Sequence, residues 1–165
     1  MHPANKWLIG TVTAALISGA ALWEGTKYVS YRDLGGVITV CMGYTGKDIV
    51  VSKRYTDAEC KQLLRTELAS HGKGVLSCVQ RPLKQNEYDA YTLFAYNVGV
   101  TGFCNSTSAK LFNAGRNKEA CDRLAFTPDG QPNWSYVKGK FVKGLHNRRL
   151  FERKMCLGDT IEYKS

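Results

Sequence analysis

The order of apolar and polar positions divides the chain into an uncharged N-terminal stretch, a short β-rich segment and a longer helical part. No side chain in residues 7–23 carries a charge. As a helix, this stretch would be about 26 Å long, slightly shorter than a typical bilayer core. Most of its residues are small or mildly polar, so it would hold a membrane weakly. The pattern therefore predicts a weakly hydrophobic N-terminal helix that can just span a bilayer.

Three roles are open for residues 7–23. Lys6 and the α-amino group precede the stretch, so the positive-inside tendency favours a membrane segment with a cytoplasmic N terminus and an exported body. Small residues such as Ser18 and Ala20 would also suit a cleaved signal peptide. A buried helix of a soluble core is the third possibility. Of the three, we favour a membrane segment that stays attached to the chain.

The pattern changes after Glu24 to short β-type stretches separated by glycine. Residues 28–31 and 37–42 are the predicted strands, and Gly35 and Gly36 lie in the turn between them. These two stretches predict a small antiparallel sheet.

Helical spacing governs most of the remaining chain. Thr56 and Glu59 have the spacing of a capping box, which predicts a helix over residues 57–71 that ends at Gly72 and Gly74. Apolar residues at helical spacing predict further helices over residues 86–98, 106–114, 118–124 and 144–157. One small sheet followed by several helices predicts an α+β fold, without a linker or an internal repeat.

The chain has 165 residues, with 23 Lys and Arg against 14 Asp and Glu, for a net charge of +9. That length corresponds to about one domain, which is large enough to bury its own core. The positive charge favours a polyanionic partner, and nucleic acid, anionic lipid and bacterial wall polymers fit it equally well. Because no zinc-finger spacing or base-stacking motif accompanies the basic residues, we expect no nucleic-acid partner.

The cysteines are even in number and scattered, without the paired C-x-x-C spacing of a zinc site. They predict disulfides, and therefore export to an oxidising compartment, whereas buried thiols in a cytosolic protein are the alternative. Of fifteen possible pairings, we favour 78 with 104 and 121 with 156, which leaves 41 with 60. Nothing in the residues indicates a metal site or another cofactor. The six are Cys41, Cys60, Cys78, Cys104, Cys121 and Cys156.

Two carboxylates and a hydroxyl lie around the predicted junction of helix and sheet: Glu24, Asp33 and Thr39. Glycoside hydrolysis needs one carboxylic acid that donates a proton and a second, ionised carboxylate that directs water or stabilises the transition state. Glu24 follows Trp23 in apolar surroundings and fits the first role, while Asp33 lies in a wetter, glycine-lined loop. Two carboxylates alone carry little weight, because most acidic residues only solvate a surface.

The spacing Glu24, eight residues, Asp33, five residues, Thr39 resembles the pattern of the phage-type lysozymes, glycoside hydrolase family 24. The resemblance continues in order through nearly the whole chain after residue 22. Where many members have a histidine after the first sheet glycine, this chain has Tyr44. The other matching landmarks are Gly43, Gly46, Pro82, Leu83, Gln85, Asn86, Tyr88, Asp89, Ala90, Phe94, Asn97, Val98, Gly99, Phe103, Ser106, Thr107, Gly144, Leu145, Arg148, Arg149 and Glu152.

The resemblance implies a lysozyme-like fold, with a small antiparallel sheet lobe and a larger helical lobe. It implies an endolysin that hydrolyses the β-1,4 bond between N-acetylmuramic acid and N-acetylglucosamine in peptidoglycan glycan strands, and so lyses the host cell for phage release. Glu24 would be the general acid, and Asp33 with Thr39 would hold the attacking water for a single displacement with inversion. A non-catalytic wall-binding module and a cationic membrane-disrupting protein are the alternatives.

Four further residues are implied as substrate-groove or helix-cap residues, and a purely structural role is equally open for each. They are Asn97, Phe103, Ser106 and Thr107.

The family's body begins with a helix whose last turns carry the catalytic Glu, so residues 15–23 must also supply that helix. Removal of this stretch at Ala20 would leave Glu24 almost at a new N terminus, which counts against a cleaved signal. This dual use resembles the signal-arrest-release endolysins. We therefore divide the chain into a signal-anchor segment, 1–23, that refolds onto the enzyme, and a catalytic domain, 24–165. We expect a monomer that the host export machinery places in the inner membrane and that is then released into the periplasm.

Overall fold

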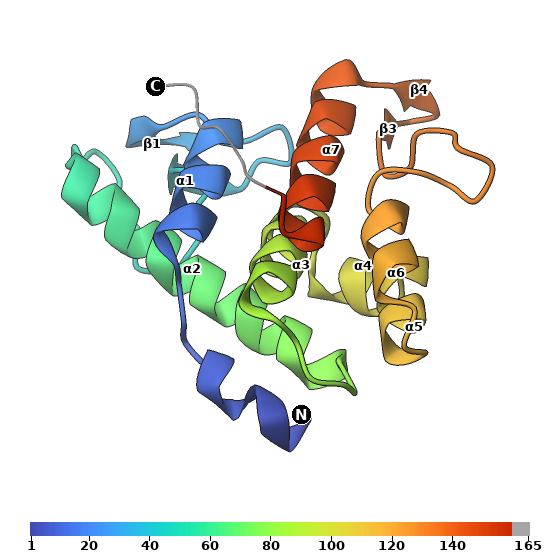
Figure 1. Cartoon of the computed structure of the whole chain (residues 1–165). Coiled ribbons are helices and arrows are strands. Elements are labelled where there is room, and N and C mark those ends of the chain that lie inside the picture. The colour runs from blue at the N-terminus through green and yellow to red at the C-terminus, as the bar shows by residue number, and fades with distance from the viewer. Residues whose placement is uncertain (160–165) are drawn as a thin grey trace.

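A computed structural model describes residues 1–159 of the chain. A small sheet lies beside a larger group of helices, as Figure 1 shows, with α3 in the middle of the helical group. The predicted α+β class is confirmed. The elements are η1 (Pro3–Leu8), α1 (Ala14–Trp23), β1 (Lys27–Arg32), β2 (Ile38–Cys41), α2 (Asp57–Cys78), α3 (Gln85–Val98), α4 (Val100–Cys104), α5 (Thr107–Asn113), α6 (Asn117–Arg123), β3 (Tyr136–Val137), β4 (Lys140–Phe141) and α7 (Lys143–Leu157).

The N-terminal stretch is interrupted, so the prediction of one continuous helix over residues 7–23 is wrong. The 3-10 helix η1 ends before Gly10, which turns the chain with a φ of 72° that favours glycine. Helix α1 then begins after Thr13, whose hydroxyl accepts a hydrogen bond from the Leu16 N–H at 3.0 Å. Within residues 1–159, no helix is both long and apolar enough to cross a membrane.

Both parts of the N-terminal stretch pack into the same core as the rest of the chain. Leu8 of η1 and Leu16 and Ala20 of α1 are fully buried. The buried Asn5 side chain donates to the Arg81 carbonyl at 2.9 Å and accepts from the Leu83 N–H at 2.8 Å. In this structure the first 23 residues are therefore part of the folded body, and residues 15–23 supply a helix that ends beside Glu24.

The sheet follows the predicted strands within one residue at each end. Strands β1 and β2 are antiparallel, with Tyr31 opposite Thr39 and Arg32 opposite Ile38. Asp33 begins the turn between them, and its Oδ1 accepts from the N–H groups of Gly35 at 2.8 Å and Val37 at 2.9 Å. A second antiparallel pair, β3 with β4, was not predicted, because each strand has only two residues.

Helix α2 has the predicted capping box and is longer than predicted. The Thr56 N–H donates to Glu59 Oε2 at 2.8 Å, and the Glu59 N–H donates back to Thr56 Oγ1 at 3.1 Å. The predicted end at Gly72 is wrong, since the helix continues to Cys78. A Cβ at Gly72 would lie 1.9 Å from the Tyr88 hydroxyl, and one at Gly74 would lie 2.5 Å from Val100. These glycines therefore permit close helix packing instead of ending the helix.

Three disulfides connect elements that are distant in sequence, and their pairing is the one favoured from the sequence. They close loops of 19 to 35 residues, a range in which a crosslink typically contributes about 3 kcal/mol to stability. The pairs are Cys41–Cys60, between β2 and α2, Cys78–Cys104, between the ends of α2 and α4, and Cys121–Cys156, between α6 and α7.

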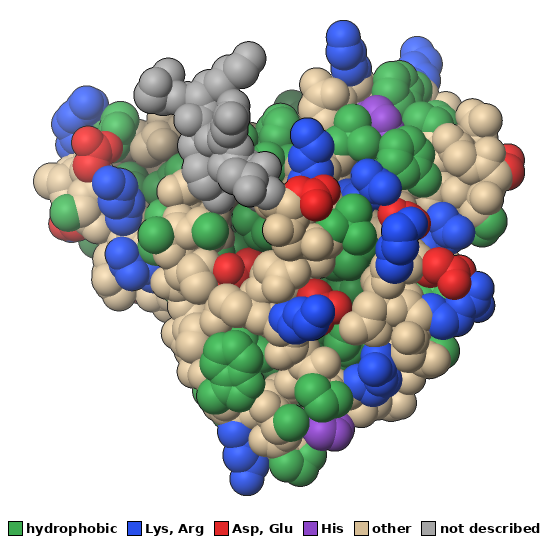
Figure 2. Space-filling view, viewed as in Figure 1, with side chains coloured by type: hydrophobic (Ala, Val, Ile, Leu, Met, Phe, Trp, Pro, Cys, Tyr) green, Lys and Arg blue, Asp and Glu red, His purple; other side chains and the backbone are tan. Residues whose placement is uncertain are grey.

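Positive charge is not gathered in one place on the face that Figure 2 shows. Lys and Arg side chains are spread over it, with acidic side chains among them. Two of the basic residues near the C terminus, Arg148 and Arg149, are buried and belong to an internal charge network.

Candidate active site

Glu24 caps the C-terminal end of α1, where its N–H donates to the Ala20 carbonyl at 3.1 Å. Its side chain is 26% exposed, and Arg148 Nη2 donates to its Oε1 at 2.8 Å. The Arg148 side chain is only 7% exposed, so this contact is largely shielded from water. The contact holds the Glu24 carboxylate, at the end of α1, against α7. The two residues are 124 positions apart in the sequence.

Arg148 also lies beside a second carboxylate, that of Glu152. The Arg148 Nε lies 3.7 Å from Glu152 Oε1, and the Arg149 Nε lies 2.7 Å from Glu152 Oε2. Glu152 is fully buried, and burial raises its pKa to about 7 although both arginines favour the ionised form. Arg148 therefore joins a half-buried carboxylate to a fully buried one.

A pocket of about 310 Å³ opens beside Glu24, where the helices meet the sheet. The end of α1, helices α2 and α3 and the segment after β2 all contribute to it. The lining residues are Glu24, Met42, Gly43, Thr45, Glu67, His71 and Tyr96.

Two aromatic rings give this pocket a fixed polar wall. The Tyr96 hydroxyl donates to the Met42 carbonyl at 2.5 Å, which ties α3 to the end of β2. His71 Nδ1 lies 2.7 Å from the Glu67 carbonyl, to which it can only donate, so Nε2 is the ring nitrogen left for other partners. The His71 ring packs edge-on against Tyr96 at 5.3 Å between ring centroids. Burial raises the pKa of Tyr96, so its hydroxyl stays neutral.

Asp33 lies in the turn between β1 and β2 and Thr39 lies in β2, and neither is among the residues that line this pocket. Asp33 is exposed in the turn, where two N–H groups hold its Oδ1. Thr39 is 3% exposed, and its hydroxyl donates to the Val37 carbonyl at 3.0 Å. Val37 therefore hydrogen-bonds to both side chains, with its N–H donating to Asp33 and its carbonyl accepting from Thr39.

A model of the Phage lysozyme family matches residues 21–152 of the chain. The chain belongs to the phage lysozyme family. It is therefore a glycoside hydrolase, as the resemblance implied. The matched residues include every side chain of the pocket beside Glu24 and both arginines of the charge network.

Individual relatives agree with this assignment. The lysozyme is 41% identical over 134 residues to a SAR-endolysin of Enterobacteria phage PA-2, covering 81% of this chain and 77% of that one. It is 37% identical to a SAR-endolysin of Pseudomonas phage phiKMV over 98% of each chain. Among solved structures, it is similar to the muramidase domain of SpmX from Asticaccaulis excentricus, with a TM-score of 0.77 and 25% identity over 89% of this chain and 97% of that chain. The predicted lysozyme-like fold is confirmed.

The four implied groove residues of this lysozyme differ in their surroundings. Phe103 is fully buried and its ring lies 5.0 Å from that of Tyr91, so it packs in the core. Ser106 caps α5 by accepting from the Ala109 N–H at 3.1 Å. These contacts are structural ones, and substrate contact by Phe103 or Ser106 stays a prediction. Asn97 and Thr107 are exposed, and their contact with substrate stays a prediction.

Four residues of the site have no role that local sequence patterns predict: Arg148, Glu67, His71 and Tyr96. Arg148 was a landmark of the family resemblance, but nothing local connects it to Glu24. Glu67 and His71 are four apart in a predicted helix, a spacing that places both on one face. The hydroxyl of Tyr44, at the position where many family members have a histidine, donates to Asp48 Oδ1 at 2.5 Å.

Proposed function

We propose that this lysozyme is an endolysin that hydrolyses the β-1,4 bond between N-acetylmuramic acid and N-acetylglucosamine in peptidoglycan, and so lyses the host cell for phage release. The observation that carries the proposal is the position of Glu24. Its carboxyl group lines a pocket at the junction of sheet and helices, partly shielded and held by a buried arginine. A general acid needs such a fixed position beside the glycosidic oxygen.

Glu24 would donate its proton to the leaving glycosidic oxygen. Arg148 contacts Oε1, and in the described part of the chain no donor contacts Oε2, so Oε2 is the oxygen that can carry the proton. Arg148 would also stabilise the carboxylate that forms after the transfer. Arg148 is therefore a positioning residue in this proposal.

Asp33 and Thr39 would hold the water that attacks the sugar carbon from the opposite face. The turn N–H groups fix Asp33 Oδ1 and leave Oδ2 for that water. An inverting mechanism needs about 6.5 to 9.5 Å between the two carboxyl groups to admit the water. Support comes from the family spacing of the three residues and from the rigid turn that holds two of them.

Mass spectrometry of the soluble products tests this function. Purified peptidoglycan should yield muropeptides with N-acetylmuramic acid at the reducing end, and proton NMR of the first product should show the inverted α-anomer. Glu24→Gln should yield none of them. Glu119→Gln, at an exposed glutamate that pairs with Arg116, is the matched control and should cleave normally. Equal lysis of permeabilised cells by Glu24→Gln would instead support a membrane-disrupting protein.

We also propose that residues 1–23 tether the enzyme, as a monomer, to the host inner membrane after export, with a cytoplasmic N terminus, before release into the periplasm. Residues 24–165 form the catalytic domain, of which 160–165 lie outside the described residues. The uncharged stretch and the SAR-endolysin relatives support this proposal. A membrane-inserted stretch would hold Glu24 at the bilayer surface, apart from Asp33 and Thr39, and the enzyme would be inactive.

The tether is tested by comparing two forms of the intact protein. In energised inner-membrane vesicles the tethered form should leave peptidoglycan intact, while the released form should cleave it and retain the full mass of the chain. Size-exclusion chromatography with light scattering should give a monomer for the released form. Equal activity of both forms, or a released chain without residues 1–20, would contradict the tether.

A further inference from the structure

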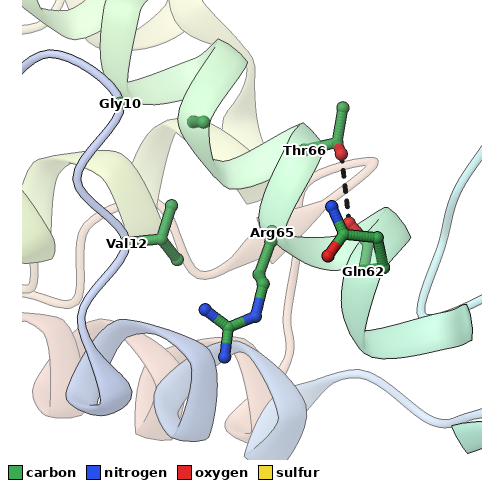
Figure 3. Close-up of a pocket in the computed structure, with 6 residues that line it drawn as sticks. Gly10, Val12, Gln62, Arg65 and Thr66 are labelled. Atoms are coloured by element: carbon green, nitrogen blue, oxygen red, sulfur yellow. Dashed lines mark hydrogen bonds between the residues drawn. The ribbon is translucent and has the colours of Figure 1, made fainter. Parts of the chain in front are cut away.

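A second pocket, of about 460 Å³, lies between the N-terminal stretch and α2. Gly10 and Val12, in the link between η1 and α1, form one side, and one face of α2 forms the other. Figure 3 shows that the side chains of Val12 and Arg65 both extend into the space between these two segments. None of these residues lines the pocket beside Glu24. The α2 residues are Gln62, Arg65, Thr66 and Ala69.

Arg65 is the charged residue of this pocket, and its guanidinium has no partner in the described part of the chain. Each of the other arginines donates to an oxygen atom or packs on an aromatic ring. They are Arg32, Arg54, Arg81, Arg116, Arg123, Arg148, Arg149 and Arg153. A guanidinium offers five N–H donors in a planar fork, a geometry that matches the oxygens of a phosphate or carboxylate.

Three other donors belong to residues that line this pocket and have no acceptor in the described part of the chain. The backbone N–H groups of Gly10 and Val12 donate to no acceptor within residues 1–159, and neither does the side-chain amide of Gln62. Among residues 1–159, no acidic side chain lines the pocket. A positive φ at Gly10 turns the backbone here, and a Cβ at that position would meet open space.

We propose that this pocket binds a phosphate group, either as free phosphate or as the phosphate of a phospholipid headgroup. Arg65 binds two of the oxygens, and the N–H groups of Gly10 and Val12 donate from the opposite side. The apolar side chains of Val12 and Ala69 leave room for the carbon that a phosphodiester carries.

Binding there is coupled to the position of the N-terminal stretch. One side of the pocket exists only while residues 10–12 lie against α2, so a phosphate that binds both sides stabilises this docked arrangement by mass action. Bound phosphate should therefore slow hydrogen exchange at the amides of Gly10 and Val12 more than in the rest of the chain.

The test is a titration of the whole protein with inorganic phosphate at constant ionic strength in chloride. The melting temperature should rise with phosphate in the parent, and Arg65→Ala should bind at least tenfold more weakly. Arg65→Lys keeps the charge without the fork and should be intermediate. Lys61→Ala, which removes an exposed charge of the same helix outside the pocket, is the matched control and should bind as the parent does. The melting temperature of each variant without phosphate checks that it is folded.

Sedimentation with vesicles of phosphatidylglycerol distinguishes the two sources of the phosphate group. Arg65-dependent binding of vesicles without a response to free phosphate would identify the headgroup, and the reverse would identify the free ion. The proposal is overturned if Arg65→Ala responds to both as the parent does, if Lys61→Ala loses as much binding as Arg65→Ala, or if neither probe binds.

Discussion

Glu24 and Glu152 both lie beside Arg148, but they differ in their exposure to solvent. Glu24 is partly exposed in a pocket and contacts Arg148 through a single oxygen, whereas Glu152 is fully buried between Arg148 and Arg149. A substrate can reach the first and not the second. The comparison teaches that the same side chain is reactive or structural according to what surrounds it.

The largest expected effect is on catalysis by Glu24→Gln. The amide keeps the shape but cannot donate the proton, so kcat should fall by about 10³-fold or more. The melting temperature should change little, because an amide oxygen can still accept from Arg148. Turbidity loss of permeabilised Gram-negative cells gives the rate, and thermal denaturation gives the stability. A variant that lost stability together with activity would show that the two glutamates do not differ in role.

Glu152→Ala should act on stability instead. It leaves the buried Arg149 without a carboxylate, and breaking a buried pair by removing one partner typically costs about 3 to 5 kcal/mol in the free energy of unfolding. Urea denaturation at pH 7 measures the loss. Glu119→Ala, at an exposed pair, should cost less than about 1 kcal/mol. Equal costs for the two variants would contradict a structural role for Glu152.

The raised pKa of Glu152 gives a pH dependence with a defined sign. The folded state holds this proton more tightly than the unfolded chain, in which the carboxyl titrates near 4.5. The stabilisation is therefore complete below about pH 4.5 and is lost as the pH rises through 7, by at most about 1.4 kcal/mol per pH unit. Glu152→Gln lacks this titration, so the unfolding free energy of the parent minus that of the variant should fall as the pH rises from 4.5 to 7 and level off towards pH 8. A difference that is flat with pH would show that Glu152 is ionised throughout.

Arg148→Lys should give the smallest effect, and it should affect both catalysis and stability because Arg148 lies beside both glutamates. Lysine keeps the charge but cannot contact both carboxylates with the planar fork of arginine. We expect kcat to fall about tenfold and the unfolding free energy to fall by about 1 to 2 kcal/mol. Steady-state kinetics on soluble glycan should show the loss in kcat more than in KM. A change in KM alone would mean that Arg148 binds substrate instead of positioning Glu24.

Local patterns predicted much of the fold. The strands, the capping box before α2 and the positions of α3, α5, α6 and α7 all depend on residues a few positions apart. The predicted helix end at Gly72 and Gly74 was wrong, because the partners that require glycine there, Tyr88 and Val100, lie on other helices. The break at Gly10 was missed because an uncharged stretch looks the same whether it spans a bilayer or packs in pieces against a core.

The site could be predicted only in part for the same reason. Glu24 was found through its spacing to Asp33 and Thr39 in the family pattern. Its contact with Arg148 spans 124 residues, and the pocket joins three helices and the segment after β2, which no local spacing reveals. A family landmark does not by itself identify a site residue. Phe103 matches the family pattern, yet its side chain is fully buried in the core.

The most direct test of the account is to measure glycan cleavage per folded molecule for Glu24→Gln and Glu152→Gln side by side, at a temperature where both are folded. Soluble muropeptides released per minute from purified peptidoglycan, quantified by mass spectrometry, are the readout. Glu152→Gln should release them at a rate within about tenfold of the parent, and Glu24→Gln should release almost none. Release by Glu24→Gln at the parent rate would contradict the assignment of Glu24 as the general acid.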